Sequence, residues 1–539
     1  MPPTHEVTNQ PPPLLDHDVA AGDAALMEAV LRHGADPGPV RTLGALAGSG
    51  RAQRWAAEAD ANPPVLRTHD RYGNRIDEVD FHPAWHELMR VAVGAGLHGT
   101  AWTSIAPAAH VTRAASFYVW SQAETGHGCP ISMTYAVVPA LRAEPALAST
   151  YLPGLTGTGY DPGLRPAPEK AGLLAGMGMT EKQGGSDVRA NTTRAVPEPD
   201  GGGYRLTGHK WFCSAPMCDL FLVLAQTDAG LTCFLVPRVL PDGSRNPFRL
   251  QRLKDKLGNR SNASAEVEFE QTFGWRVGPE GRGVPTILPM VTMTRLDCVL
   301  GSAATVRAAT AQAIHHATHR RAFGRPLREQ PLMRAVLADL VLESEAATAL
   351  GIRLASTVDT GEVGLGRLAT AVGKFWVCKR AAAVTAEALE CLGGNGFVED
   401  SGMPRLYREA PLNSIWEGSG NVIALDVLRA AAHQPESVAA FLAEAEAAAG
   451  ADSRLDAAVK RLRGELADPD GIEPRARRVA SLMALCLQGS LLVRYAPAAV
   501  ADAFCATRLD GDWGWVLGTL PPVLDARTIV DRAAPLPDR

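Results

Sequence analysis

Hydrophobic residues recur with helical spacing over most of the chain, and alanine and leucine dominate the apolar positions. Three long runs of this kind, with lengths typical of a helical bundle, lie at 303–319, 332–356 and 368–392. Four shorter runs follow at 438–449, 454–466, 475–493 and 498–507. Residues 24–142 have the same pattern, interrupted by prolines. The pattern predicts a mainly helical chain with one central exception.

That exception is residues 176–275, where short β-branched and aromatic runs are separated by turns. The strand-like runs are Tyr204–Gly208, Leu220–Leu224, Thr232–Val236 and Ala265–Phe269. Pro-Asp-Gly turns begin at Pro199 and Pro241. Strands at this spacing predict a small antiparallel β domain.

A chain of 539 residues is too long for one hydrophobic core. We therefore expect a multidomain α+β fold divided at the changes of pattern. The expected parts are an N-terminal helical domain with a Pro-rich leader (1–175), a β domain (176–284), a helical bundle (285–437) and a C-terminal helical extension (438–539).

Composition restricts the class of protein and its cellular compartment more than it restricts the function. The net charge is −5, and the nine cysteines form no C-x-x-C pair, so neither a disulfide framework nor a zinc site is predicted. His315, His316 and His319 lie one helical turn apart, but no carboxylate or cysteine has ligand spacing, which favours a solvated helix face over a metal site. With no basic region followed by an apolar run at Met1, and no stretch of about 18 apolar residues, we expect a cytoplasmic protein that does not span a membrane.

The most informative segment is Gly176-Met-Gly-Met-Thr-Glu-Lys-Gln-Gly-Gly-Ser-Asp-Val188. Its glycines allow backbone to approach a ligand closely, and the hydroxyls of Thr180 and Ser186 can donate hydrogen bonds to ring oxygens or phosphate. Two interpretations remain open from this segment alone: a flavin-binding loop, or a Gly-rich turn in which Ser186 and Asp187 cap the next element.

Four later segments bear on that choice. They are Gly208-His-Lys-Trp-Phe-Cys213, Arg320-Arg-Ala-Phe-Gly324, Glu390-Cys-Leu-Gly-Gly-Asn-Gly-Phe397 and Ile415-Trp-Glu-Gly-Ser-Gly-Asn421. In this order, and together with the first segment, they resemble the signatures of the acyl-CoA dehydrogenase family over roughly residues 80–430. The Asn9-Gln-Pro-Pro start, Phe81-His-Pro-Ala-Trp-His86, Lys254-Asp-Lys-Leu-Gly-Asn-Arg-Ser-Asn262 and the long extension resemble the AidB-like branch, the alkylation-response flavoproteins of bacteria.

The resemblance implies the fold of that family, with FAD between the β domain and the bundle, and an oxidoreductase acting on CH–CH groups. It assigns Glu417 as the base that removes the α-proton of an acyl thioester. A partly desolvated carboxylate would have its pKa raised toward working pH, which suits a general base. The alternative is that Glu417 satisfies a buried turn, although Gly418 and Gly420 favour close approach of a ligand.

The resemblance also assigns FAD contacts. Thr180 is expected at the isoalloxazine edge, Ser186 at the pyrophosphate and Trp211 beside the ring. The alternatives without a ligand are that Thr180 is a hydroxyl on a strand and that Trp211 is an aromatic residue of the core. The full set is Met177, Gly178, Met179, Thr180, Gly185, Ser186, Trp211, Phe212, Cys213, Arg320, Phe323, Gly393, Gly394, Gly396, Ile415, Trp416, Ser419 and Asn421. One departure is Cys213, which stands where the family usually has Thr, so a hydroxyl bond to flavin N5 is missing.

Arg320 and Phe323 correspond to the pair that reaches FAD across a subunit boundary in the family. The resemblance thus implies a homo-oligomer, with a tetramer expected. Arg320 is alternatively an exposed cation at a helix end, next to Arg321.

Double-stranded DNA is the second partner that the AidB-like branch implies, bound independently of sequence through the extension. Two basic clusters lie there, Lys460, Arg461 and Arg463, and Arg475, Arg477 and Arg478; Arg429 is a weaker candidate for guiding an anion toward the flavin. However, residues 430–539 hold 12 Lys and Arg against 15 Asp and Glu, so DNA contact requires the clusters to share one face.

The function expected from these observations is a weak α,β-dehydrogenation of short acyl-CoAs, linked to resistance to DNA alkylation. One rival is oxidation of another small carbon acid such as a nitroalkane, but that branch typically uses Asp as base. Another is a DNA-associated shielding protein whose flavin is structural. Neither the physiological substrate nor the electron acceptor can be read from the sequence.

Overall fold

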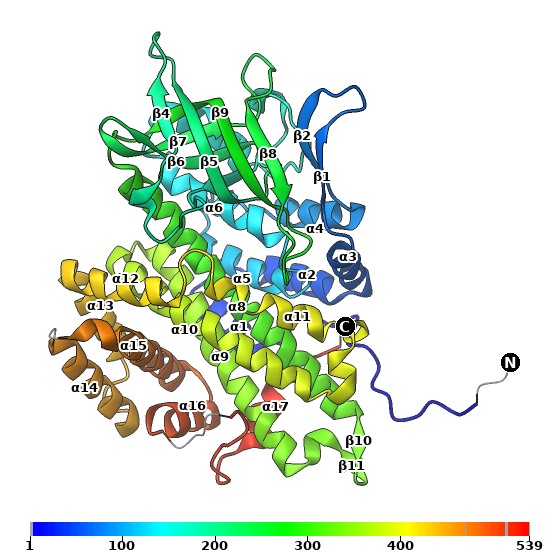
Figure 1. Cartoon of the computed structure of the whole chain (residues 1–539). Coiled ribbons are helices and arrows are strands. Elements are labelled where there is room, and N and C mark those ends of the chain that lie inside the picture. Colours follow the sequence, from blue (N-terminus) through cyan, green and yellow to red (C-terminus); the bar gives the residue numbers. More distant parts are fainter. Residues whose placement is uncertain (1–3, 469–470, 512–515, 538–539) are drawn as a thin grey trace. The chain divides into compact units, whose positions relative to one another are not determined.

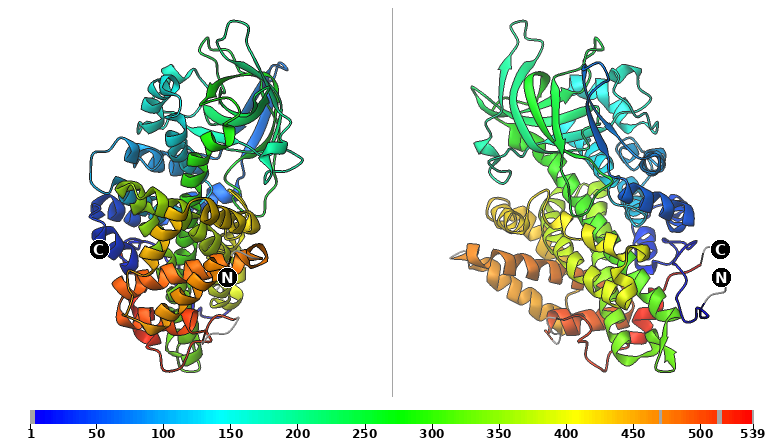
Figure 2. Two further views of the ribbon diagram at one scale, coloured as in Figure 1. Left: turned by 90° about the vertical axis from the view of Figure 1, so that its left-hand side faces the viewer. Right: turned by 45° about the vertical axis from the view of Figure 1, so that its right-hand side comes forward.

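The computed structural model describes residues 4–468, 471–511 and 516–537, and Figure 1 labels their helices and strands. The residues group into two compact units. The helical unit comprises residues 1–53, 110–123 and 298–539, and the sheet unit comprises residues 54–109 and 124–297. Two further views are given in Figure 2.

The helical unit contains most of the long apolar helices. Its α-helices are α1 (Ala24–Arg32), α2 (Pro37–Gly48), α5 (Ala109–Ser121), α9 (Pro331–Thr360), α10 (Val363–Glu390), α11 (Met403–Glu409), α12 (Gly420–His433), α13 (Pro435–Ala445), α14 (Ser453–Ala467), α15 (Ile472–Tyr495), α16 (Ala498–Phe504) and α17 (Ala526–Arg532). A short hairpin joins β10 (Arg321–Ala322) to β11 (Arg325–Pro326). The long helix α8 (Gly283–His319) begins in the sheet unit and continues into this one.

The sheet unit combines strands with shorter helices. The helices are α4 (Pro83–Gly94), α6 (Gly128–Leu141), α7 (Pro145–Thr156) and most of α3 (Gly50–Ala61). The strands are β1 (Val65–His69), β2 (Arg75–Asp80), β3 (Ala175–Gly178), β4 (Arg194–Pro197), β5 (Tyr204–Ser214), β6 (Leu220–Thr227), β7 (Gly230–Pro237), β8 (Phe248–Leu253) and β9 (Ser264–Val277).

Seven of these strands form one sheet, in the order β3-β6-β4-β5-β9-β7, with β8 on β9 and β6 also paired with β7. The four strand-like runs of the sequence lie in β5, β6, β7 and β9, which confirms the predicted β segment. The continuous apolar run of β6 has six buried residues in a row, because both faces of the strand are covered. The sheet is mixed, since β3 runs parallel to β6.

The hairpin β1–β2 was not predicted, because residues 24–142 read as helical. Its turn is fixed by Asp70, whose Oδ1 accepts hydrogen bonds from the Tyr72 and Asn74 N–H groups at 2.8 and 2.9 Å. Gly73 there has φ +85°, which glycine adopts at little cost. The signal was present as an Asp-x-x-Gly-Asn turn between two short alternating runs.

The C-terminal extension packs closely onto the bundle. Arg508 is fully buried and forms ion pairs with Asp339 and Glu343 of α9. Among the described residues, α8 and α15 are long and apolar enough to cross a membrane, yet 78% and 67% of their apolar windows are buried. Such burial is typical of helices in a protein core.

Candidate active site

In the sheet unit, the glycine-rich loop leaves β3 and is tied to the middle of β5. The Trp211 N–H donates to Thr180 O at 2.8 Å, which brings the two predicted flavin contacts onto neighbouring backbone. Glu181 and Gly184 then exchange two backbone hydrogen bonds and close a tight turn, with Gly184 at φ +149°. Gly185 is obligatory next to it, because an added Cβ would lie 2.4 Å from Thr180 Oγ1.

A buried ion pair, which was not predicted from the sequence, holds this loop in place. Lys210 Nζ donates to Glu181 Oε1 at 2.8 Å and to Leu224 O at 2.8 Å, and neither charged side chain is exposed. The Glu181 carboxylate also accepts hydrogen bonds from the Thr192 and Thr193 N–H groups. Burial alone would raise the pKa of Glu181, but Lys210 and these donors outweigh it and bring the pKa well below its usual value.

The strand β5 carries a bulge at the predicted flavin contacts. Its pairing with β9 shifts register between Lys210 and Cys213, so both of these side chains are buried while Trp211 and Phe212 are directed outward. Phe212 is 52% exposed. Lys254 Nζ lies 3.2 Å from the centre of the Trp211 ring and therefore covers one face of it.

Cys213 is directed away from the exposed edge. Its Sγ lies 3.8 Å from Met177 O, to which the thiol can donate, and burial raises the pKa of the thiol to about 12. The group is therefore a neutral, packed thiol. This supports the expectation that at this position only the backbone N–H is available to a ligand.

The motif Lys254–Asn262 folds around Glu124 inside the sheet unit. Glu124 Oε1 accepts hydrogen bonds from Ser261 Oγ and the Gly126 N–H, each at 2.7 Å, and Oε2 lies 2.8 Å from His127 Nδ1. Although burial acts to raise the pKa of Glu124, the His127 and Ser261 contacts lower it to about 2. The motif therefore has a structural role around a buried carboxylate.

In the helical unit, the predicted base Glu417 lies on a strained turn before α12. Glu417 has φ +57° and Gly418 has φ +105°. A non-glycine residue in this region is uncommon and costs energy, so such a conformation is a recognised mark of functional sites. The Glu417 side chain is half-buried, neither in the core nor freely solvated.

Lys374 positions this turn, and it too was missed from the sequence. Its side chain is 1% exposed on α10, and Nζ donates to Trp416 O at 2.8 Å and to Gly418 O. The two carbonyls flank Glu417 on either side. Trp416 is fixed further by a 2.7 Å hydrogen bond from Nε1 to Asn413 Oδ1. A single buried ammonium group thus holds the backbone around the predicted base.

The residues after the turn contact both the bundle and the extension. An added Cβ on Gly420 would lie 2.4 Å from Lys379 Cε, so the Lys379 side chain packs directly against this backbone. Asn421 Oδ1 accepts a 3.2 Å hydrogen bond from Arg477 Nη1, and the Arg477 guanidinium lies 5.9 Å from the Phe375 ring. Arg477, predicted as a DNA contact, therefore lies beside the Glu417 turn. Ser419 and Ile415 are exposed.

The other helical-unit residues assigned to FAD lie in two turns. Gly393, with φ +60°, and Gly394 have no protein atom within 4 Å of an added Cβ, whereas Gly396 would clash with Leu389 O. Phe323 occupies the tip of the β10–β11 hairpin at φ +51° and is 97% exposed. Arg320 is oriented by a hydrogen bond from Nη1 to Asn9 O at 2.6 Å.

The basic clusters of the extension come together, but acidic residues neutralise half of them. Arg475 and Arg478 both form ion pairs with Glu465 of α14, the helix that carries the other cluster, and Arg463 pairs with Glu446. Lys460 and Arg461 are exposed, and Arg461 Nη2 donates to Leu509 O at 2.8 Å. Arg429 is exposed on α12.

The three histidines on α8 do not form a solvated face, which corrects that expectation. His316 is buried, and burial followed by the charges of Arg320 and His315 lowers its pKa to about 4. His315 Nε2 lies 2.8 Å from Pro12 O. No group of three or more possible metal ligands occurs among the described residues.

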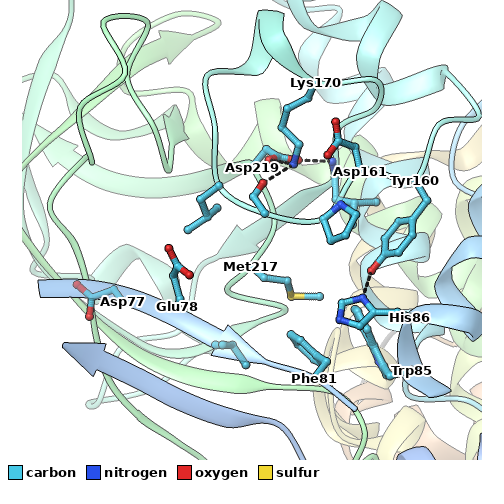
Figure 3. A pocket seen from close by; sticks show the side chains of 15 residues that line it. Asp77, Glu78, Phe81, Trp85, His86, Tyr160, Asp161, Lys170, Met217 and Asp219 are labelled. Atoms are coloured by element: carbon cyan, nitrogen blue, oxygen red, sulfur yellow. Dashed lines mark hydrogen bonds and ion pairs between the residues drawn. The ribbon is translucent and has the colours of Figure 1, made fainter. Parts of the chain in front are cut away.

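A separate cavity of about 110 Å³ lies within the sheet unit, lined by Phe81, Trp85, His86 and Tyr160 (Figure 3). His86 Nδ1 and Tyr160 OH are 2.7 Å apart. Its carboxylates are all paired with basic side chains: Asp77 with Arg75, Glu78 with Arg245, Asp161 with Arg165 and Asp219 with Lys170. None of the predicted site residues lines it.

Comparison with known proteins matches three family models: the adaptive response protein AidB N-terminal domain (residues 9–162), the acyl-CoA dehydrogenase middle domain (176–272) and the acyl-CoA dehydrogenase C-terminal domain (281–432). The chain is 48% identical over 516 residues to the putative acyl-CoA dehydrogenase AidB of Escherichia coli K12, covering 94% of this chain and 95% of that protein.

Two solved structures share the fold. Caenorhabditis elegans ACDH-11, in complex with C11-CoA, has a TM-score of 0.83 at 26% identity and covers 98% of this chain and 97% of that one. A Bacillus anthracis acyl-CoA dehydrogenase complexed with FAD has a TM-score of 0.65 at 18% identity, covering 79% and 81%.

The fold and the two matching domain models place the chain among the acyl-CoA dehydrogenases, which are FAD-dependent oxidoreductases. Within that class, the chain belongs to the AidB family, as its N-terminal domain and its identity over nearly the whole length show. The predictions of family, fold class, enzyme class and FAD cofactor are thereby confirmed; the individual site residues stay predictions.

The residues present fit FAD. The Ser186 hydroxyl is exposed at the glycine-rich turn, and Gly393 and Gly394 leave open backbone. Asn191 donates from Nδ2 to Met179 O at 2.9 Å, while its buried Oδ1 has no hydrogen-bond partner in the described part of the chain. Buried polar atoms without partners are rare in folded proteins, so one beside the loop favours a bound group there.

Proposed function

We propose that the protein oxidises acyl-CoA thioesters at the α and β carbons, with Glu417 as the general base. The observation that carries this proposal is the Glu417 turn, in which a carboxylate has a positive φ and buried Lys374 holds both flanking carbonyls. A structural carboxylate would not need this strained and braced geometry.

The chemistry requires a base and a hydride acceptor at one substrate. Glu417 would take the α-proton, and bound FAD would supply the acceptor for the hydride of the β carbon, so that the thioester would leave as an enoyl-CoA. A positioned carboxylate contributes about a hundredfold or more to such a proton transfer. The turn fixes where the carboxylate stands, because Lys374 leaves the flanking peptide units little freedom.

Anaerobic titration of the FAD-loaded protein tests the proposal. We expect bleaching of the oxidised flavin absorption with at least one of butyryl-, octanoyl- and undecanoyl-CoA; the longest is included because the related nematode protein was solved with C11-CoA. Bleaching by a nitroalkane, with none by any thioester, would contradict the proposal and favour the carbon-acid rival.

We also propose that this activity belongs to the adaptive response to DNA alkylation, in the cytoplasm. The match to the adaptive response protein model and the 48% identity to the E. coli protein support the first part. The nine buried, unbridged cysteines support the second, because disulfides are rare in the cytosol.

The assembly that we propose is a homotetramer. Phe323, which is itself assigned to FAD, is 97% exposed, and Phe397, which follows the assigned Gly396, is 83% exposed. Large apolar side chains at such exposure favour a subunit boundary.

A shielding role with a structural flavin remains the alternative function. The anaerobic titration with acyl-CoA thioesters distinguishes it from the enzyme, because a structural flavin would not be bleached by thioesters.

Contact with double-stranded DNA, if made by the extension, is expected to be weak and independent of sequence. Arg463, Arg475 and Arg478 are paired with carboxylates, which leaves Lys460, Arg461 and Arg477 as the cluster cations that are exposed and not in an ion pair within the described chain. Up to three phosphate contacts predict a slope of log affinity against log salt of about −3.

Anisotropy titrations with two unrelated duplexes check this expectation. The double variant Lys460→Glu/Arg461→Glu should lose binding to both duplexes alike, whereas the matched reversal Arg527→Glu should not. A slope near −5, or no binding by the intact protein at low salt, would contradict it; the latter favours a purely enzymatic role.

A further inference from the structure

The N-terminal arm is the extended blue segment in Figure 1, and its first described residues form no helix or strand. The Asn9-Gln-Pro-Pro stretch of the arm is exposed, yet it makes a dense set of polar contacts within the helical unit. Pro11 and Pro12 restrict their own φ angles and those of their predecessors, which keeps this stretch extended. The extended arm therefore holds Asn9 and Gln10 at successive positions along the helical unit.

Asn9 clamps the turn that carries Arg320. Its Nδ2 donates to Arg321 O at 2.8 Å, and its Oδ1 accepts from the Arg321 N–H at 2.8 Å, so one side-chain amide pairs with one residue as a neighbouring strand would. Its own backbone carbonyl accepts from Arg320 Nη1 at 2.6 Å. Asn9 has φ +58°, a conformation that Asn tolerates better than most residues.

The next arm residues reach two further segments. Gln10 Oε1 accepts from Asn395 Nδ2 at 3.2 Å, in the turn Gly393–Phe397, and Pro12 O lies 2.8 Å from His315 Nε2 on α8. Consecutive arm residues thus connect Arg320 to the glycine turn, although 75 positions separate Arg320 from Asn395 in the sequence.

The charge of Arg320 is oriented but not neutralised. Within the described chain its guanidinium has no carboxylate within 4 Å, and only Nη1 is used, against a carbonyl. A guanidinium retains donors for a phosphate in this state. The open backbone of Gly393 and Gly394 adds space for a ligand.

We propose that Asn9 and Gln10 are positioning residues for FAD: the arm fixes the Arg320 guanidinium and the Gly393–Gly396 turn for the cofactor's phosphate-bearing half. This inference rests on the assignment of Arg320 and that turn to FAD. The contacts are exposed, where hydrogen bonds add little to folding stability, so the expected effect is on cofactor affinity more than on unfolding.

The test uses the full-length apoprotein and FAD fluorescence quenching. Asn9→Gly removes the side-chain clamp without strain at φ +58°, and Gln10→Ala removes the second contact. Each should raise the FAD dissociation constant about five- to tenfold, the loss expected for one or two hydrogen bonds, with an unchanged urea midpoint and unchanged oligomeric state. Thr8→Ala, at the neighbouring exposed position, is the matched control and should change nothing.

A pair of truncations makes the result independent of any one variant. Removing residues 1–8 should leave FAD affinity intact, whereas removing residues 1–12 should lower it at least as much as Asn9→Gly. Unchanged affinity in Asn9→Gly and in the longer truncation, with weaker binding in Arg320→Ala, would overturn the role of the arm. Unchanged affinity in Arg320→Ala as well would instead overturn the assignment of Arg320 to the FAD site.

Discussion

Glu417→Gln is expected to abolish most flavin reduction by an acyl-CoA while leaving FAD bound. The substitution keeps the shape of the side chain and removes its basicity, so the rate of anaerobic bleaching should fall at least about a hundredfold. Stopped-flow absorbance under saturating thioester measures this rate directly. Because the Lys374 bonds go to backbone carbonyls, the turn should keep its geometry in the variant.

The matched control for this result is Glu436→Gln, an isosteric change at an exposed carboxylate on α13. It should reduce as fast as the parent. If Glu417→Gln also reduces at the parental rate, another carboxylate is the base.

Pattern alone predicted those parts of the molecule in which burial follows directly from local sequence. The apolar run of β6 is buried on both faces, and the long runs at 332–356 and 368–392 lie in α9 and α10. Distant motifs in family order located the two turns that carry Thr180 and Glu417. In each case the residues that form the pattern are the residues of the predicted strand, helix or turn, or lie beside them in the sequence.

The residues that brace those turns could not be predicted, because each acts across a distance in sequence. Lys374 reaches carbonyls 42 and 44 positions away, and Lys210 pairs with a carboxylate 29 positions away. A lysine in an amphipathic run reads as a solvated residue unless its partner is known. The basic clusters show the same limit: the acidic balance of the extension indicated neutralisation, but only the structure identifies Glu465 and Glu446 as the partners.

Lys210→Met is expected to give the largest loss of stability in the sheet unit. The substitution leaves the Glu181 carboxylate buried without its ammonium partner, and breaking such a pair typically costs about 3–5 kcal/mol. Urea unfolding at neutral pH measures the loss. FAD affinity should fall with it, because Glu181 follows Thr180 and Lys210 precedes Trp211.

The double variant Lys210→Met/Glu181→Gln and the pH dependence distinguish the ion pair from lost packing. Since the folded-state pKa of Glu181 is depressed, its contribution is present above the unfolded value near 4.5 and is lost as the pH falls below it. The stability gap between parent and Lys210→Met should therefore shrink as the pH falls, because burial raises the pKa of the unpaired Glu181 and it takes up a proton while the paired carboxylate of the parent stays ionised. The double variant, which buries no charge, should be more stable than Lys210→Met at neutral pH. A gap that is independent of pH, together with a double variant no better than the single one, would show that Lys210 acts through packing alone and that the buried charge pair does not hold the flavin loop.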